Sequence, residues 1–143
     1  KRLAEFSKTA SDEIAVAWHE LPLLGETSNM AARAALAAKR QGAYVEFHDR
    51  LMKSPFRASP EYLEQLATDL GVNEDQLVRD MASDGVAREL EDSAALSRLF
   101  AFVGTPALVV GRTVIQGQVN DATLREIIDL EREQEWGSVC SST

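Results

Sequence analysis

A chain of 143 residues with 45% hydrophobic and 27% charged residues has an ordinary globular composition, and it is long enough to bury one sizeable core. Its formal net charge of −8 disfavours nucleic acid and anionic membranes as partners, because both surfaces repel an acidic protein. No apolar run approaches membrane-spanning length and no signal peptide is recognisable, so we expect no membrane insertion.

The first part of the chain is predicted to form one helix and one strand. Apolar residues at helical spacing predict a short helix over residues 1–11. Ile14, Val16 and Trp18 then recur at every second position, which predicts a strand over residues 14–20.

Five further helices are predicted before the next β signal. The first is Ala-rich, with Thr27 or Ser28 as its N-cap and Gly42 at its C-terminal stop, and its small residues imply close packing against neighbours. Ser59 and Asn73 are the expected N-caps of two later helices. The predicted ranges are 29–41, 43–53, 60–71, 74–82 and 86–102.

Residues 102–118 carry the only dense β signal of the chain. Residues 107–110 form an unbroken apolar run of strand length that is rich in β-branched residues. Gly111 opens a two-residue connection, where it can take the positive φ of a type II′ turn, and residues 113–115 lead back. Pro106 has no N–H for a ladder, so it can only open the strand or lie at its edge. The pattern predicts a β-hairpin that begins at a proline.

A last helix follows the hairpin, capped by Asn120 or Asp121 and running to about Trp136. The predicted sheet then has three short strands, and its first strand lies far in sequence from the hairpin. A sheet this thin among so many helices indicates that one strand of the fold is missing.

The histidines and the cysteine carry little functional signal. The single cysteine, Cys140, excludes an intrachain disulfide, and its Ser-rich surroundings favour a plain thiol in a tail. His48 shares an apolar helical face, so it is expected to be a half-buried structural histidine, while His19 is expected to be a polar residue on the face opposite Trp18. These three residues lack the spacing of a zinc site, so no metal is expected.

Four stretches in a fixed order resemble a known family. They are ELPLLG at residues 20–25, the Ala-rich residues 31–38, YVEFHDRLM at residues 44–52, and GTP at residues 104–106 with its hairpin. Together they resemble the DsbA-type branch of the thioredoxin superfamily, in which a helical insertion splits a thioredoxin core.

The resemblance implies an α/β fold, with a single thioredoxin-like domain over residues 1–143. Residues 1–27 and 103–136 would form the thioredoxin core, and residues 28–102 would form the mainly helical insertion. Residues 137–143 are expected to be a flexible tail.

In that family the first strand leads to a Cys-x-x-Cys motif at a helix N-terminus, which stabilises the thiolate of the first cysteine. Residues 1–6 resemble the stretch that follows this motif. We therefore expect the Cys-x-x-Cys, and the first strand of the fold, to precede Lys1 or to be absent from a natural variant. This chain alone would then hold no catalytic residue and would be unable to exchange disulfides. A strand from a second copy, in a homodimer, is a candidate to cover the missing one.

The same resemblance implies a substrate-binding role for Gly104, Thr105 and Pro106. Pro106 is expected to follow a cis peptide bond and to face the cysteines, and Thr105 is expected to offer its backbone to an extended substrate. The implied partners are protein thiols and disulfides, and no cofactor is implied. The implied location is the bacterial periplasm or another extracytoplasmic compartment.

Two alternative functions stay open. A non-enzymatic thioredoxin-like binding module would keep the groove at Thr105 and Pro106 without thiols. A glutathione-dependent isomerase or transferase of the same split fold would carry a serine in place of the nucleophilic cysteine.

Overall fold

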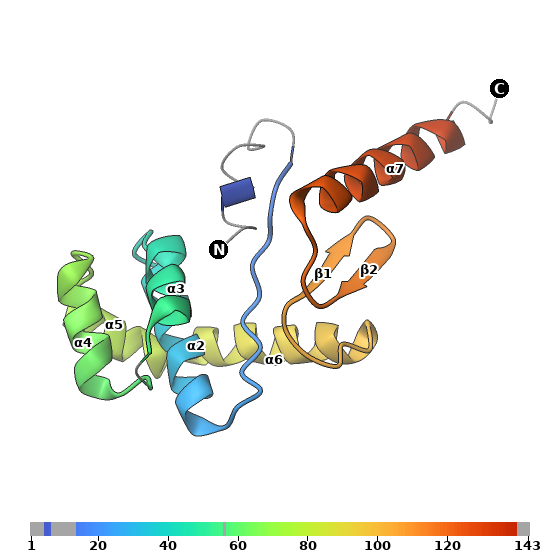
Figure 1. Cartoon of the computed structure of the whole chain (residues 1–143). Coiled ribbons are helices and arrows are strands. Elements are labelled where there is room, and N and C mark those ends of the chain that lie inside the picture. Colours follow the sequence, from blue (N-terminus) through green and yellow to red (C-terminus); the bar gives the residue numbers. More distant parts are fainter. Residues whose placement is uncertain (1–4, 7–13, 56, 140–143) are drawn as a thin grey trace. The chain divides into compact units, whose positions relative to one another are not determined.

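The computed structural model describes residues 5–6, 14–55 and 57–139 (Figure 1). The chain forms two compact units. One consists of residues 17–97, and the other of the described parts of residues 1–16 and 98–143. None of the described helices is long and apolar enough to cross a membrane.

The unit of residues 17–97 is helical, and its alanines let the helices approach closely. Helix α2 (Glu26–Lys39) contacts its three successors, and its residues Ala34, Ala37 and Ala38 are fully buried, which confirms the predicted close packing. The other helices are α3 (Tyr44–Lys53), α4 (Pro60–Asp69), α5 (Glu74–Met81) and α6 (Asp84–Leu99), the last ending just beyond the unit.

Three helices begin at the side-chain caps that the sequence predicts. Ser59 Oγ caps α4 and Asn73 Oδ1 caps α5, each by accepting from the N–H three residues on, at 3.2 and 2.8 Å. Asn120 Oδ1 caps helix α7 (Asp121–Val139) in the same way at 2.9 Å. Helix α7 runs past its predicted end at Trp136.

Helix α2 begins earlier than predicted, so the predicted caps Thr27 and Ser28 are wrong. Gly25, with φ 81°, turns the chain into the helix at Glu26. The Gly25 carbonyl already accepts the first helical hydrogen bond, from the Asn29 N–H at 3.0 Å. The helix therefore starts from a backbone turn, without a side-chain cap.

Helix α6 also begins and ends earlier than predicted. The Ser83 hydroxyl accepts from the Val86 N–H at 3.3 Å, so the polar cluster at residues 83–85 starts α6 as well as ending α5. The helix ends at Leu99, because Ala101 takes φ 52° in the left-handed region, where an α-helix cannot continue.

Residues 14–20 form no strand, which contradicts the prediction. The alternation itself is confirmed, because Ile14, Val16 and Trp18 are partly buried and the residues between them are exposed. A strand also needs a hydrogen-bonded neighbour, and among the described residues none pairs with this segment. Most of the helix predicted over residues 1–11 lies outside the described residues.

The predicted hairpin is confirmed. Strands β1 (Ala107–Val110) and β2 (Thr113–Gln116) pair antiparallel, in a register that places Val110 opposite Thr113. Gly111 takes φ 57° and Arg112 has no positive φ, which matches a type II′ turn and excludes type I′.

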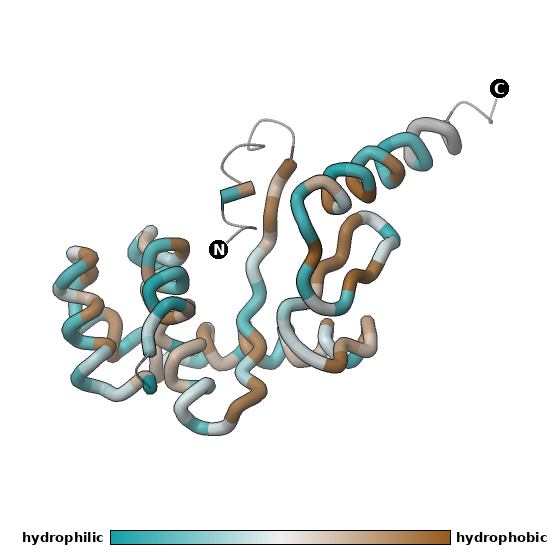
Figure 2. Tube along the Cα trace, in the orientation of Figure 1, coloured by the Kyte–Doolittle hydropathy of each residue, from teal (hydrophilic) through white to brown (hydrophobic). Residues whose placement is uncertain are grey.

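One face of the hairpin is covered by apolar packing. Leu108, Val110 and Ile115 pack on a cluster formed by Phe6 and Leu124, which are both 4% exposed. Helix α7 supplies Leu124 and contacts β1. Figure 2 shows the apolar residues along both strands. This packing fixes which strand residues face away from α7.

Candidate functional site

The candidate residues Gly104, Thr105 and Pro106 lie immediately before β1. The Thr105–Pro106 peptide bond is cis, as expected. Thr105 and Pro106 are exposed, and Gly104 is partly buried. The Gly117 N–H donates to the Pro106 carbonyl at 2.8 Å, which extends the ladder by one residue beyond each strand. Pro106 therefore opens the strand, as its missing N–H requires.

The main chain of Thr105 is open. Its N–H and carbonyl make no hydrogen bond to any described residue, and the residue is exposed. Backbone groups in this state can pair with an extended peptide, as the groups of a free strand edge do.

A glutamine side chain holds the segment that leads into this loop. Gln116 Oε1 accepts from the Val103 N–H at 3.2 Å, and Gln116 Nε2 donates to the Ala101 carbonyl at 3.0 Å. The side chains around these bonds give little cover, since Val103 is 91% and Leu99 75% exposed. The segment before the loop therefore has exposed apolar side chains, and hydrogen bonds to Gln116 attach it to β2.

The turn at the other end of the hairpin is attached to α7 through Glu131. Glu131 Oε1 accepts from the Thr113 hydroxyl at 2.6 Å, and Oε2 accepts from the Arg112 N–H at 3.0 Å. The hydrogen bond from Thr113, followed by that from the Arg112 backbone, lowers the pKa of Glu131 below its usual range. A carboxylate that bridges a turn and a helix in this way attaches the turn end of the hairpin to α7.

A second polar cluster lies within the unit of residues 17–97. Glu20 Oε1 accepts from the Tyr44 hydroxyl and faces His48 Nδ1, both at 2.7 Å. The Trp18 ring lies 6.3 Å from the Tyr44 ring and 5.8 Å from the His48 ring, centroid to centroid. Burial, reinforced by the Glu20 charge, raises the pKa of Tyr44 well above its usual value. His48 is half-buried and satisfied, which confirms its predicted structural role.

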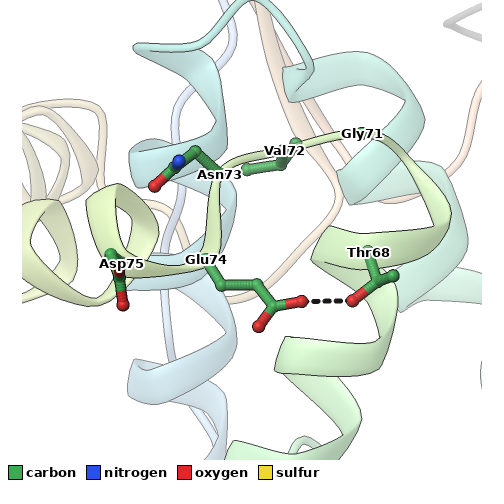
Figure 3. A pocket seen from close by; sticks show the side chains of 6 residues that line it. All are labelled: Thr68, Gly71, Val72, Asn73, Glu74 and Asp75. Carbon is green, nitrogen blue, oxygen red and sulfur yellow. Dashed lines mark hydrogen bonds between the residues drawn. The ribbon is translucent and has the colours of Figure 1, made fainter.

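A polar hollow of about 500 Å³ lies where α4 turns into α5 (Figure 3). Figure 3 shows the Glu74 carboxylate directed at the Thr68 hydroxyl, which donates a hydrogen bond to it. Glu74 and Asp75 occupy the first turn of α5, so they already complement the positive end of its dipole. The hollow therefore has no free positive group to attract an anion. Its lining residues are Thr68, Gly71, Val72, Asn73, Glu74 and Asp75.

The remaining candidates carry no chemistry in the described part of the chain. His19 is exposed on the face opposite Trp18, as predicted, with Nδ1 3.3 Å from Ser93 Oγ. Cys140 lies outside the described residues. Within those residues, no three His, Cys, Asp or Glu side chains are grouped to hold a metal ion.

The sequence reasoning missed Glu20, Gln116 and Glu131. Glu20 stood in the ELPLLG stretch without a role of its own. Gln116 and Glu131 had no signal, because a single amide or carboxylate at an exposed strand end or helix position is ordinary. Only the partners that the fold brings to them distinguish these residues.

Known structures share this fold. A thioredoxin-like oxidoreductase from Silicibacter pomeroyi DSS-3 is 34% identical with a TM-score of 0.84, over 92% of this chain and 76% of that one. ScsC from Proteus mirabilis in a compact conformation is 27% identical with a TM-score of 0.77, over 90% and 71%. The thiol-disulfide exchange protein alpha-DsbA2 from Wolbachia pipientis shares the fold, at 24% identity and a TM-score of 0.80, over 89% and 72%.

Comparisons of the sequence itself give one match to a family and none to a curated protein. No curated protein matches the chain significantly. The family model of the DSBA-like thioredoxin domain matches residues 1–129. With this match, and with a 34% identical oxidoreductase covering nearly all of it, the chain belongs to the DSBA-like thioredoxin domain family.

Proposed function

We propose that the chain is the larger part of a thiol:disulfide oxidoreductase that exchanges disulfides with protein substrates. Its reactive dithiol would be a Cys-x-x-Cys preceding Lys1, because the sequence has no cysteine besides Cys140. By the same family relationship, we place the protein in the periplasm or another extracytoplasmic compartment.

The observation that carries this proposal is the open main chain of Thr105 beside Pro106. An extended substrate segment passing this loop would find one N–H and one carbonyl without partners. Two such hydrogen bonds fix the direction and register of a peptide without reading its sequence. That behaviour suits an enzyme that receives many different protein substrates.

The exchange itself balances without a cofactor. A thiolate of the Cys-x-x-Cys attacks one sulfur of a substrate disulfide, forms a mixed disulfide and releases the other substrate sulfur as a thiolate. The second cysteine then attacks the mixed disulfide, which leaves the protein oxidised and the substrate as a dithiol. The reverse sequence oxidises a substrate dithiol. Thr105 would hold the substrate backbone during either direction.

The test uses the protein that contains residues 1–143 together with the segment before Lys1. Its coding sequence is read for a Cys-x-x-Cys, and the purified protein is assayed for insulin reduction and for oxidation of a dithiol peptide. We expect activity that disappears when the first cysteine is replaced by serine. An intact Cys-x-x-Cys with no activity in both assays overturns the proposal.

A binding module without redox activity is the second candidate, favoured by the single cysteine of the chain. It predicts that the longer protein has no Cys-x-x-Cys and still binds an unfolded, reduced and alkylated protein. A serine at the first cysteine position would favour a glutathione-dependent isomerase or transferase instead. A glutathione-binding measurement then distinguishes this enzyme from the binding module.

A further part of the proposal concerns a second copy of the chain. β1 pairs only with β2 among the described residues, so its other edge carries unpaired backbone groups. A strand from a second copy would satisfy them, which predicts a homodimer for residues 1–143 in sedimentation equilibrium. A monomer at all concentrations overturns this part without affecting the oxidoreductase proposal.

A further inference from the structure

We infer that Gln116 is a positioning residue that fixes the Thr105–Pro106 loop through the segment before it. Gln116 itself would not touch the substrate. This inference rests on the proposed function, because it assigns Gln116 to the loop where we place the substrate backbone.

Hydrogen bonds from the end of β2 reach the segments on both sides of the loop. Gln116 is the last residue of β2, and its side-chain amide pairs with the backbone of Ala101 and Val103, accepting from one and donating to the other. The next residue, Gly117, donates its N–H to the Pro106 carbonyl at 2.8 Å. Two consecutive residues at the end of β2 therefore hold both sides of the loop, and Thr105 lies between the two attachments.

Side-chain packing around residues 101–103 is too sparse to fix the position of this segment. The Val103 side chain is 91% exposed, and no atom comes within 4 Å of a Cβ built on Gly104. The Phe100 and Phe102 side chains are only partly buried, and their rings stack on each other, with centroids 5.7 Å apart. The Ala101 N–H donates to the Arg98 carbonyl at 3.2 Å, at the end of α6, and the two hydrogen bonds to Gln116 attach residues 101–103 to the hairpin.

The two hydrogen bonds require one acceptor and one donor on the side chain of residue 116, which a neutral carboxamide or carboxylic acid provides. One oxygen must accept from the Val103 N–H, and the other group must donate to the Ala101 carbonyl. A glutamate at position 116 fits the space but has no donor when ionised, and its charge faces a carbonyl oxygen. When protonated, the same glutamic acid can accept and donate as the glutamine does.

The first experiment measures amide hydrogen exchange at Val103 by NMR in the chain of residues 1–143. Gln116→Leu should lower the protection factor of this amide about ten-fold, the scale of one lost hydrogen bond, because leucine offers the Val103 N–H no acceptor. The control is Gln118→Leu, which makes the same change two residues away, at an exposed side chain with no hydrogen bond to a described residue. It should leave Val103 unchanged.

The same sample provides its own test of folding, because protection of the other hairpin amides shows that the hairpin is still formed. Gln116→Glu should lower protection at Val103 less than Gln116→Leu does, because a carboxylate oxygen can still accept from the Val103 N–H. Unchanged protection at Val103 in Gln116→Leu, or an equal loss in Gln118→Leu, overturns the inference.

The second experiment places Gln116→Leu and Gln118→Leu in the longer protein that carries the Cys-x-x-Cys. The probe is a short self-quenched peptide with one disulfide, whose reduction releases fluorescence. We expect Gln116→Leu to raise KM several-fold with kcat nearly unchanged, and Gln118→Leu to alter neither. An unchanged KM alongside lost Val103 protection overturns the positioning role. An inactive parent protein overturns the proposed function. The hydrogen exchange at Val103 tests separately whether Gln116 attaches the loop.

Discussion

Glu20 Oε1 lies 2.7 Å from His48 Nδ1, which determines where the histidine carries a proton. An ionised carboxylate can only accept, so Nδ1 must be the protonated nitrogen. His48 Nε2 makes no hydrogen bond to a described residue, and no buried side-chain nitrogen among those residues lacks a partner. Nε2 therefore reaches solvent, while Nδ1 ties α3 to the end of the 14–20 segment.

Glu20→Gln should destabilise the chain by about 1.5–3 kcal/mol, the range for hydrogen bonds to a charged group. The amide still offers Tyr44 and His48 one acceptor oxygen, but it lacks the charge that strengthens both hydrogen bonds. Urea unfolding followed by circular dichroism measures the change. Glu91→Gln is the control, because Glu91 is exposed on α6 and makes no hydrogen bond to a described residue. A double-mutant cycle with Tyr44→Phe should show coupling, and additive effects would contradict a shared network.

Tyr44 should stay protonated in the folded protein at a pH where a free tyrosine ionises, because its pKa is raised by burial and by Glu20. The unfolded state then loses a proton that the folded state keeps, so stability falls as pH rises above about 10. Tyrosinate absorbance measures this. Wild type and Tyr44→Phe should give the same rise when folded, whereas in urea the wild type should give the larger one. A larger rise in folded wild type refutes the prediction.

Glu131 should titrate below the usual range of a glutamate, about 4.3, since hydrogen bonds from Thr113 and Arg112 lower its pKa. A carboxylate with a depressed pKa in the folded state stabilises the protein above its unfolded pKa and loses that effect as pH falls through the folded value. The Arg112 amide shift in NMR reports this titration. Glu131→Gln should remove it, and Glu126→Gln, an exposed change on the same helix, should preserve it.

Gly111→Ala should destabilise the hairpin more than Gly71→Ala destabilises the α4–α5 turn. Both glycines have positive φ, 57° and 66°, so both alanines incur a backbone strain of about 1–2 kcal/mol. A Cβ on Gly111 would also overlap Glu131 Oε2, whereas nothing lies within 4 Å of one on Gly71. Free energies of unfolding in urea compare the two. Equal losses would mean that Glu131 moves aside without losing its hydrogen bonds.

Features set by neighbouring residues could be read from the sequence. Ser59, Asn73 and Asn120 cap their helices through an N–H three residues away, and Gly111 forms its turn alone. The alternation at 14–20 was also readable, but strand formation depends on a partner that no local pattern supplies.

The polar contacts of the two sites could not be read in this way. Glu20 meets Tyr44 and His48 across the whole of α2, and Gln116 reaches back across the hairpin to Ala101. Each contact depends on how distant segments pack in the folded chain, and no local sequence pattern predicts which residues meet. The family resemblance pointed to the loop at Thr105 and Pro106, and only the fold shows what holds it.

The contact between Phe6 and Leu124 joins the two ends of the chain, with the whole unit of residues 17–97 between them. That unit draws its core from one continuous stretch, so the loops that it closes are shorter than the loop between Phe6 and Leu124. We therefore expect a folding order in which residues 17–97 form first, and the hairpin acquires its apolar backing in the last step.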